Sequence, residues 1–179
     1  MTPSETSFYS GFSLRNETPL FSAYRSTAPF TLSGFSYGAI LAFEEALQTE
    51  RRIDLLQLFS PAFFQDQSTG FKRLQIKAFR SNPEGYLEVF VKNCAAPSHV
   101  SLETFLSPGS EEELETLLNY TWTRENIEAL LAKGTRIEVH LGAEDAIINA
   151  QAAAAFFTPL VTLYWYKGKG HILKGKSCQ

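Results

Sequence analysis

The stretch that decides the fold runs from Thr31 to Leu41 and reads Thr-Leu-Ser-Gly-Phe-Ser-Tyr-Gly-Ala-Ile-Leu. It contains the pattern Gly-x-Ser-x-Gly, centred on Ser36. An apolar run before the pattern and an Ala/Leu-rich run after it predict a strand, a tight turn and a helix. Such a turn projects a serine hydroxyl, a weak nucleophile by itself, to where a base can reach it. We therefore predict Ser36 as a nucleophile and the Tyr37 amide, at the start of the helix, as an oxyanion donor.

Short apolar runs alternate with helical patterns along the chain. This alternation favours an α/β fold with a mostly parallel sheet, because parallel strands need crossover connections. Helices are predicted over Ala39–Leu47 and over Glu125–Ala132, the second with Thr123 as its N-cap and Gly134 just beyond its end. The predicted strands are Phe8–Gly11, Phe30–Ser33, Ile53–Phe59, Ile137–Leu141 and Val161–Trp165.

The length of 179 residues and the hydrophobic content of 44% suffice for one core, so we predict a single domain over residues 1–179. Residues 61–123 differ from the rest because aromatic and charged residues recur there at helical spacing, with no clear strand. We interpret them as an inserted helical cap. Ser110 and Glu113 have the spacing of a capping box, which predicts that a helix of the cap begins there.

A histidine that follows the last predicted strand is the candidate base for Ser36. His171 ends the turn Gly168-Lys169-Gly170-His171, which suits the presentation of a ring at the carboxyl edge of a parallel sheet. The chain has three histidines. His140 lies in a predicted strand, where we expect it to face solvent or a neighbouring side chain, and His99 is expected at the surface of the cap.

The candidate acid lies in the loop after the preceding strand. Asp145 closes Gly142-Ala143-Glu144-Asp145, where a carboxylate can orient an imidazole and balance its charge. Glu144 is the alternative, because only one of two successive loop residues is expected to reach the histidine. The order serine, acid, histidine fits either residue, and the resemblance described next implies Asp145.

Together these residues resemble the α/β-hydrolase superfamily. A narrower resemblance, to a short bacterial form of the pimeloyl-acyl carrier protein methyl ester esterases of biotin synthesis, covers nearly the whole chain. It is carried by Phe8-Tyr9-Ser10-Gly11-Phe12, Gly34-Phe35-Ser36-Tyr37-Gly38-Ala39, Leu58-Phe59-Ser60-Pro61, Phe71-Lys72-Arg73-Leu74-Gln75 and the loops of Asp145 and His171. The resemblance implies a reduced α/β-hydrolase fold of about five strands that hydrolyses the methyl ester of pimeloyl-acyl carrier protein and releases methanol. It implies no metal or organic cofactor.

The turn after the first strand departs from the wider superfamily. Larger hydrolases usually carry His-Gly there, whereas this chain has Ser10-Gly11-Phe12. Because the second oxyanion donor is a backbone amide, the amide of Phe12 is still expected to join that of Tyr37.

An acidic carrier protein with a phosphate-bearing arm calls for basic residues near the mouth of the site. Lys72, Arg73, Lys77 and Arg80 fall in one predicted cap helix, and the last three have the spacing that gathers side chains on one face. An ordinary solvated helix face is the alternative. Aromatic residues of the cap are expected either to line an apolar tunnel or to join the cap to the core; they are Phe63, Phe64, Phe71, Phe79, Tyr86 and Phe90.

The net charge of −3 provides no overall basic field for nucleic acid or an anionic membrane. The polar amino terminus and two cysteines, Cys94 and Cys178, favour a cytoplasmic protein without a disulfide. A general carboxylesterase or an acyl thioesterase of the same fold is the first alternative function. A non-catalytic binding protein that retains the scaffold is the second, and the ordered serine, acid and histidine argue against it.

Overall fold

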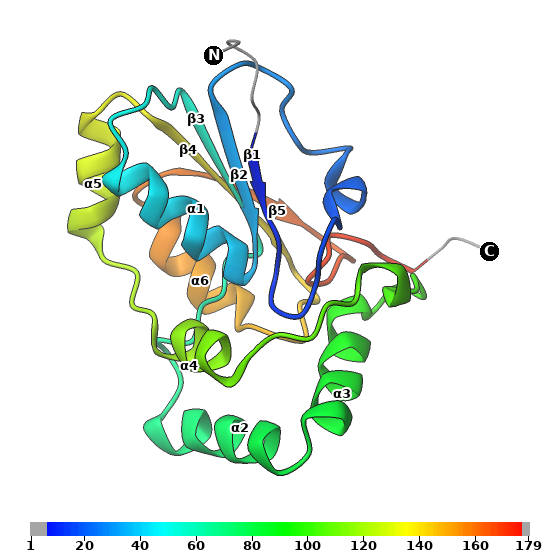
Figure 1. The fold of residues 1–179 in the computed structure, drawn as a ribbon. Coiled ribbons are helices and arrows are strands. Elements are labelled where there is room, and N and C mark those ends of the chain that lie inside the picture. Colours follow the sequence, from blue (N-terminus) through cyan, green and yellow to red (C-terminus); the bar gives the residue numbers. More distant parts are fainter. Residues whose placement is uncertain (1–6, 177–179) are drawn as a thin grey trace.

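Five parallel strands run through the centre of the computed structural model, which describes residues 7–176 (Figure 1). They lie side by side in sequence order: β1 (Ser7–Tyr9), β2 (Thr31–Phe35), β3 (Leu55–Phe59), β4 (Arg136–Gly142) and β5 (Thr162–Tyr166). The predicted α/β class and five-stranded sheet are confirmed. The first strand ends before the predicted Gly11, because the Gly11 amide donates to the carboxylate of Glu17 (2.7 Å) instead of pairing with a strand.

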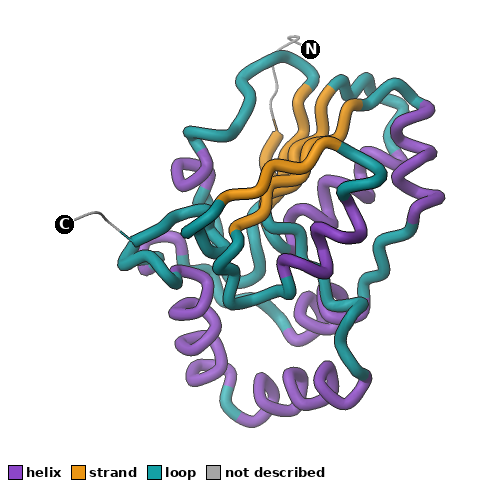
Figure 2. Tube along the Cα trace, turned by 180° about the vertical axis from the view of Figure 1, so that it is seen from behind, coloured by secondary structure: helices purple, strands orange, loops and turns teal. Residues whose placement is uncertain are grey.

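Three helices cover one face of the sheet (Figures 1 and 2). They are α1 (Tyr37–Gln48), α5 (Arg124–Ala132) and α6 (Ala150–Phe157). Each lies in a crossover between neighbouring parallel strands, and successive right-handed crossovers in one direction place their helices on the same side. Phe43, Leu130 and Phe157 bring these helices into one core with the inward side chains of the strands, and all three are fully buried.

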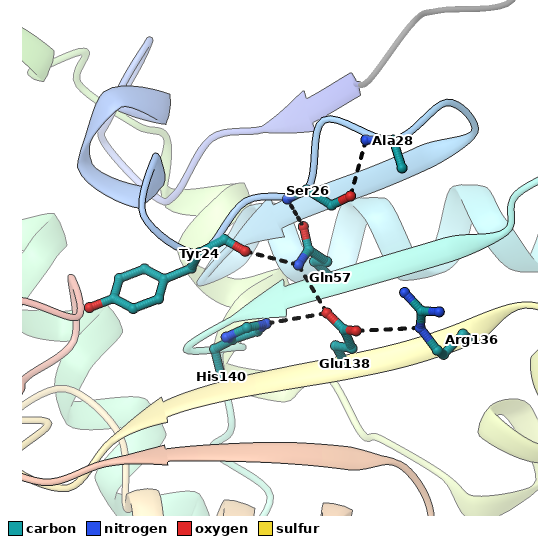
Figure 3. A network of polar contacts seen from close by, with 7 residues as sticks. All are labelled: Tyr24, Ser26, Ala28, Gln57, Arg136, Glu138 and His140. Atoms are coloured by element: carbon teal, nitrogen blue, oxygen red, sulfur yellow. Dashed lines mark hydrogen bonds and ion pairs between the residues drawn. The ribbon is translucent and has the colours of Figure 1, made fainter.

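The opposite face is covered mainly by the chain between β1 and β2, which includes the short 3-10 helix η1 (Thr18–Phe21). A polar network holds this segment on the sheet (Figure 3). The side-chain amide of Gln57 donates to the Tyr24 carbonyl (3.1 Å) and to Glu138 (3.0 Å), and it accepts from the amide of Ser26 (2.8 Å). The centre of this face is therefore polar, whereas the helical face is apolar.

A third group of helices lies beyond the carboxyl ends of the strands, where α1 begins (Figure 1). It contains α2 (Thr69–Ser81), α3 (Pro83–Ala95), the short 3-10 helix η2 (Glu103–Phe105) and α4 (Glu111–Asn119). These elements fall within residues 61–123. Their interpretation as a cap inserted into a single domain stays a prediction.

The caps predicted for α4 and α5 are confirmed, whereas α1 begins two residues before the predicted Ala39 and ends one residue after Leu47. Ser110 and Glu113 form the capping box of α4, with side-chain to amide distances of 3.1 and 2.8 Å. Thr123 caps α5, and Gly134 follows its end with a positive φ of 89°. Each such cap stabilises a helix by about 1 kcal/mol, because it satisfies an amide that has no partner within the helix.

Candidate active site

Ser36 occupies a strained turn between β2 and α1. Its φ of 52° and ψ of −114° lie in a region that side chains other than glycine rarely adopt. The flanking glycines are required by space: a Cβ at Gly34 would lie 2.1 Å from the carbonyl oxygen of Gly38, and a Cβ at Gly38 would lie 2.1 Å from that of Tyr9. The turn therefore needs both glycines of the Gly-x-Ser-x-Gly pattern.

His171 reaches Ser36 from the loop that follows β5. Its Nε2 atom lies 3.0 Å from Ser36 Oγ, and its ring packs 5.0 Å from the ring of Phe35. The residue is fully buried. Its backbone carbonyl accepts a hydrogen bond of 2.6 Å from the hydroxyl of Ser60, at the end of β3.

Asp145 lies on the other side of the His171 ring. Its Oδ2 atom is 2.6 Å from His171 Nδ1, while Oδ1 accepts from the amides of Ile147 (2.7 Å) and Ile148 (3.0 Å). The carboxylate is thus fixed at both oxygens, and a fixed carboxylate orients the imidazole that it binds. Glu144 is exposed, so the structure brings Asp145 and not its neighbour to the histidine.

The two predicted oxyanion donors lie at the ends of neighbouring segments. Tyr37 is the first residue of α1, so its amide belongs to the group at a helix start that has no acceptor within the helix. Phe12 follows Gly11, whose amide is held by Glu17. The ring of Phe12 is buried against Phe90, with 5.4 Å between ring centroids.

Two residues near this site were not predicted to act there. Glu17 is fully buried, and its Oε2 atom has no hydrogen-bond partner among residues 7–176. No local pattern marks it, because its partner Gly11 becomes a neighbour only through the turn. Ser60 lay in the quoted segment Leu58-Phe59-Ser60-Pro61, but its contact with His171 spans 111 positions of the sequence.

A cavity of about 250 Å³ opens among α2, α3, α4 and the loop after Asp145. It is largely apolar, and its polar lining is Gln75, Asn93 and the hydroxyl-bearing Tyr86. Four of the predicted cap aromatics line it: Phe64, Phe71, Tyr86 and Phe90. Burial raises the pKa of the Tyr86 hydroxyl to about 12, so that group is neutral at ordinary pH.

Two of the cap aromatics lie elsewhere. Phe63 is buried against Phe156 and Phe157 at the end of α6, with centroid separations of 5.8 and 6.1 Å. Phe79 is buried between the rings of Phe12 and Tyr86. Phe63 therefore joins the loop before α2 to α6, and Phe79 joins α2 to its neighbours.

The predicted basic residues lie on α2, which carries Lys72, Arg73, Lys77 and Arg80. All four border one groove between α2 and α4. Arg80 forms an ion pair with Glu111 of α4. Among residues 7–176 no ion pair engages Lys72, Arg73 or Lys77, so three cationic groups of this row stay available.

The remaining histidines and the described cysteine do not take part in the hydrogen-bonded series of Ser36, His171 and Asp145. His140 is buried and not solvent-facing: its ring stacks on Tyr164 at 4.7 Å, and Nδ1 lies 2.9 Å from the Tyr166 hydroxyl. His99 is exposed, as predicted. Cys94 is a buried free thiol whose pKa is raised by burial. Cys178 lies outside the described residues.

Two further findings bear on the kind of protein. Within residues 7–176 no group of three or more His, Cys, Asp or Glu side chains is placed to hold a metal ion. No helix in the same part of the chain has the length and apolar character needed to cross a membrane.

Neither a protein-family model nor a curated protein sequence matches the chain. Solved structures do match. The naproxen esterase (carboxylesterase NP) from Bacillus subtilis has a TM-score of 0.61 and 13% identity, over 94% of this chain and 77% of that one. MenH from S. aureus has a TM-score of 0.61 and 12% identity, over 97% and 90%. An N-acyl homoserine lactone degrading enzyme, Est816, has a TM-score of 0.65 and 12% identity, over 93% and 86%.

At this level of identity the likeness establishes the fold. The chain has the α/β-hydrolase fold, with a five-stranded parallel sheet and with Ser36, His171 and Asp145 hydrogen-bonded in series at its carboxyl edge.

Proposed function

We propose that the chain is a serine carboxylesterase with Ser36 as its nucleophile. The observation that carries the proposal is the continuous hydrogen-bonded series from Ser36 Oγ through the His171 ring to Asp145, with distances of 3.0 and 2.6 Å. In this arrangement a neutral imidazole accepts the serine proton on one nitrogen while the carboxylate stabilises the resulting cation on the other. The matched solved structures include carboxylesterases, which supports the same reaction class.

The reaction proceeds in two halves. Ser36 Oγ attacks the ester carbonyl and passes its proton to His171 Nε2, and the same proton then leaves with the alcohol as the acyl-enzyme forms. Water then attacks the acyl-enzyme, gives a proton to His171 and releases the acid as Ser36 regains its proton. We assign the amides of Tyr37 and Phe12 to the oxyanion that forms in each half, where one such donor typically contributes about a hundredfold or more in rate.

The proposed substrate is the methyl ester of pimeloyl-acyl carrier protein, hydrolysed in the cytoplasm to pimeloyl-acyl carrier protein and methanol for biotin synthesis. The apolar cavity beside the Asp145 loop suits a methylene chain, since Ala146 and Ile147 of its wall directly follow the acid. Lys72, Arg73 and Lys77 suit an acidic carrier protein with a phosphate-bearing arm. The resemblance in sequence points to the same substrate.

Mass spectrometry of the carrier-protein ester after incubation with the purified chain tests the reaction. We expect the substrate to lose mass as a methyl group is replaced by hydrogen. Hydrolysis of small p-nitrophenyl esters together with an unchanged carrier-protein ester would instead favour the general carboxylesterase.

Charge reversal tests the carrier-protein contact separately. The double variant Arg73→Glu, Lys77→Glu should lower kcat/KM for the carrier-protein ester about tenfold or more while sparing a small ester. Arg124→Glu on α5 is the matched control, because this exposed arginine lies on the helical face of the sheet. Equal losses on both esters, or no loss on either, would contradict docking at α2.

A further inference from the structure

Residues 59–62, at the end of β3 and just after it, form hydrogen bonds with the backbones of both Ser36 and His171. The Phe59 carbonyl accepts from the Ser36 amide (2.9 Å), and the Ala62 amide donates to the Ser36 carbonyl (3.1 Å). Between these two residues, the Ser60 hydroxyl donates to the His171 carbonyl (2.6 Å). One short segment therefore holds the proposed nucleophile and the proposed base.

Ser60, which makes this contact, has an unusual backbone conformation. It is fully buried, and its φ of 41° lies in the left-handed region that favours glycine. Its amide donates to the His140 carbonyl on the neighbouring strand (2.8 Å), which fixes the residue to the sheet. Glycine would relieve the backbone strain at this position, but it would supply no hydroxyl for His171.

The position of the His171 ring depends on its backbone, because the residue lies in a loop after β5. Within that loop the Gly170 amide donates to the Lys174 carbonyl (3.0 Å), and the Leu173 amide donates to the Gly170 carbonyl (3.0 Å). These bonds shape the loop locally. The bond from Ser60 joins the His171 backbone to the end of β3, and β3 is paired along its length with the strand that precedes Ser36.

We propose that Ser60 is a positioning residue that sets the separation between Ser36 Oγ and His171 Nε2. It acts through the backbone of His171. The proposal rests on the proposed esterase function, since it assigns Ser60 to the geometry of the same nucleophile and base. Small displacements at such a pair reduce the rate of proton transfer strongly.

Two variants of Ser60 separate positioning from stability. Ser60→Ala removes the hydroxyl and keeps the strained backbone, whereas Ser60→Gly removes the hydroxyl and relieves the strain. We expect both to lower kcat for p-nitrophenyl acetate by about tenfold with KM within about twofold, while the glycine variant has the higher Tm. Wild-type kcat in Ser60→Gly, or kcat values that follow Tm, would overturn the proposal.

Thr135→Val is the matched control. The Thr135 hydroxyl is also buried and also donates to a backbone carbonyl, that of Ile53 (2.8 Å), but it precedes β4 at the opposite end of the sheet. This variant should lose Tm and keep kcat. A loss of kcat equal to that of the Ser60 variants would show a general effect of removing a buried hydroxyl and would also overturn the proposal.

A proton NMR measurement decides the question without turnover. The proton between His171 Nδ1 and Asp145 in this short bond should give a strongly deshielded signal in protein with labelled histidine. We expect the signal to shift or broaden in both Ser60 variants and to stay unchanged in Thr135→Val; an unchanged signal in the Ser60 variants overturns the positioning role. Absence of ester hydrolysis by the wild type would count against the proposed function, while the NMR comparison would still decide the role of Ser60.

Discussion

Two buried histidines, His171 and His140, each lie near a carboxylate but have different partners on their second nitrogen. Nδ1 of His171 binds Asp145 and Nε2 faces the Ser36 hydroxyl. Nδ1 of His140 binds the Tyr166 hydroxyl, and Nε2 lies 3.7 Å from Glu138, without a hydrogen bond to any described residue. Burial and a nearby acid therefore do not define a catalytic histidine. The series from carboxylate through imidazole to an aligned hydroxyl distinguishes His171.

The largest expected difference lies in activity. Ser36→Ala and His171→Ala should each lower kcat/KM for p-nitrophenyl acetate at least about a thousandfold, because members of such a series act as a unit. His140→Gln should stay within about threefold of the wild type, since its ring packs on Phe59, Tyr164 and Tyr166 and is not part of the hydrogen-bonded series. A comparable loss in His140→Gln, with the fold intact by circular dichroism, would break the distinction.

The carboxylates beside the two histidines should differ in the same way, with Asp145 needed for activity and Glu138 not. Asp145→Asn should lower kcat about a hundredfold or more, because an amide cannot stabilise the imidazolium and favours the wrong tautomer. Glu138→Gln should leave kcat within about twofold, because Glu138 is bonded to Gln57 and Arg136 on the polar face. Steady-state kinetics on one small ester measures both, and equal effects would argue that the polar face contributes to catalysis.

The pH dependence of stability should report His140. Burial lowers the pKa of His140 from 6.5 to about 4, so the folded state binds fewer protons than the unfolded state between these values. With respect to His140, the free energy of unfolding is therefore highest above pH 6.5. It falls by roughly 3 kcal/mol in all as the pH is lowered towards 4.

Urea unfolding of the wild type and of His140→Gln between pH 4 and 7 measures this loss of the free energy of unfolding. The slope of stability against pH should be shallower in the variant. His99→Gln, which removes an exposed histidine, is the control and should keep the wild-type slope. Identical slopes in all three proteins would mean that His140 does not titrate as inferred.

The smallest expected effect concerns the partner of His140 Nδ1. Tyr166→Phe removes one hydrogen bond of 2.9 Å and should lower the free energy of unfolding by about 1 kcal/mol without changing kcat. Thermal unfolding and ester hydrolysis on the same preparation check the two parts. A fall in kcat would show that the contact between Tyr166 and His140 affects catalysis at Ser36, contrary to this expectation.

The sequence predicted the five strands to within about two residues, the caps of α4 and α5, and the residues 36, 145 and 171 that the structure joins by hydrogen bonds. The strands and caps depend on local patterns, and the three site residues follow strands whose carboxyl ends meet at one edge of a parallel sheet. The burial of His140 was not predictable in the same way, because the strand pattern does not reveal that the chain between β1 and β2 packs over that face. The contacts of Glu17 and Ser60 depend on turns and on pairs far apart in sequence, so no local signal reveals them.

Labelling with a fluorophosphonate, followed by mass spectrometry of the digested protein, tests the central claim most directly. The reagent reacts with a serine that an adjacent base activates. We expect one adduct, on Ser36, in the wild type and in His140→Gln, strongly slowed formation in His171→Ala and none in Ser36→Ala. Labelling at another serine, or equal rates in the wild type and His171→Ala, would contradict activation of Ser36 by His171.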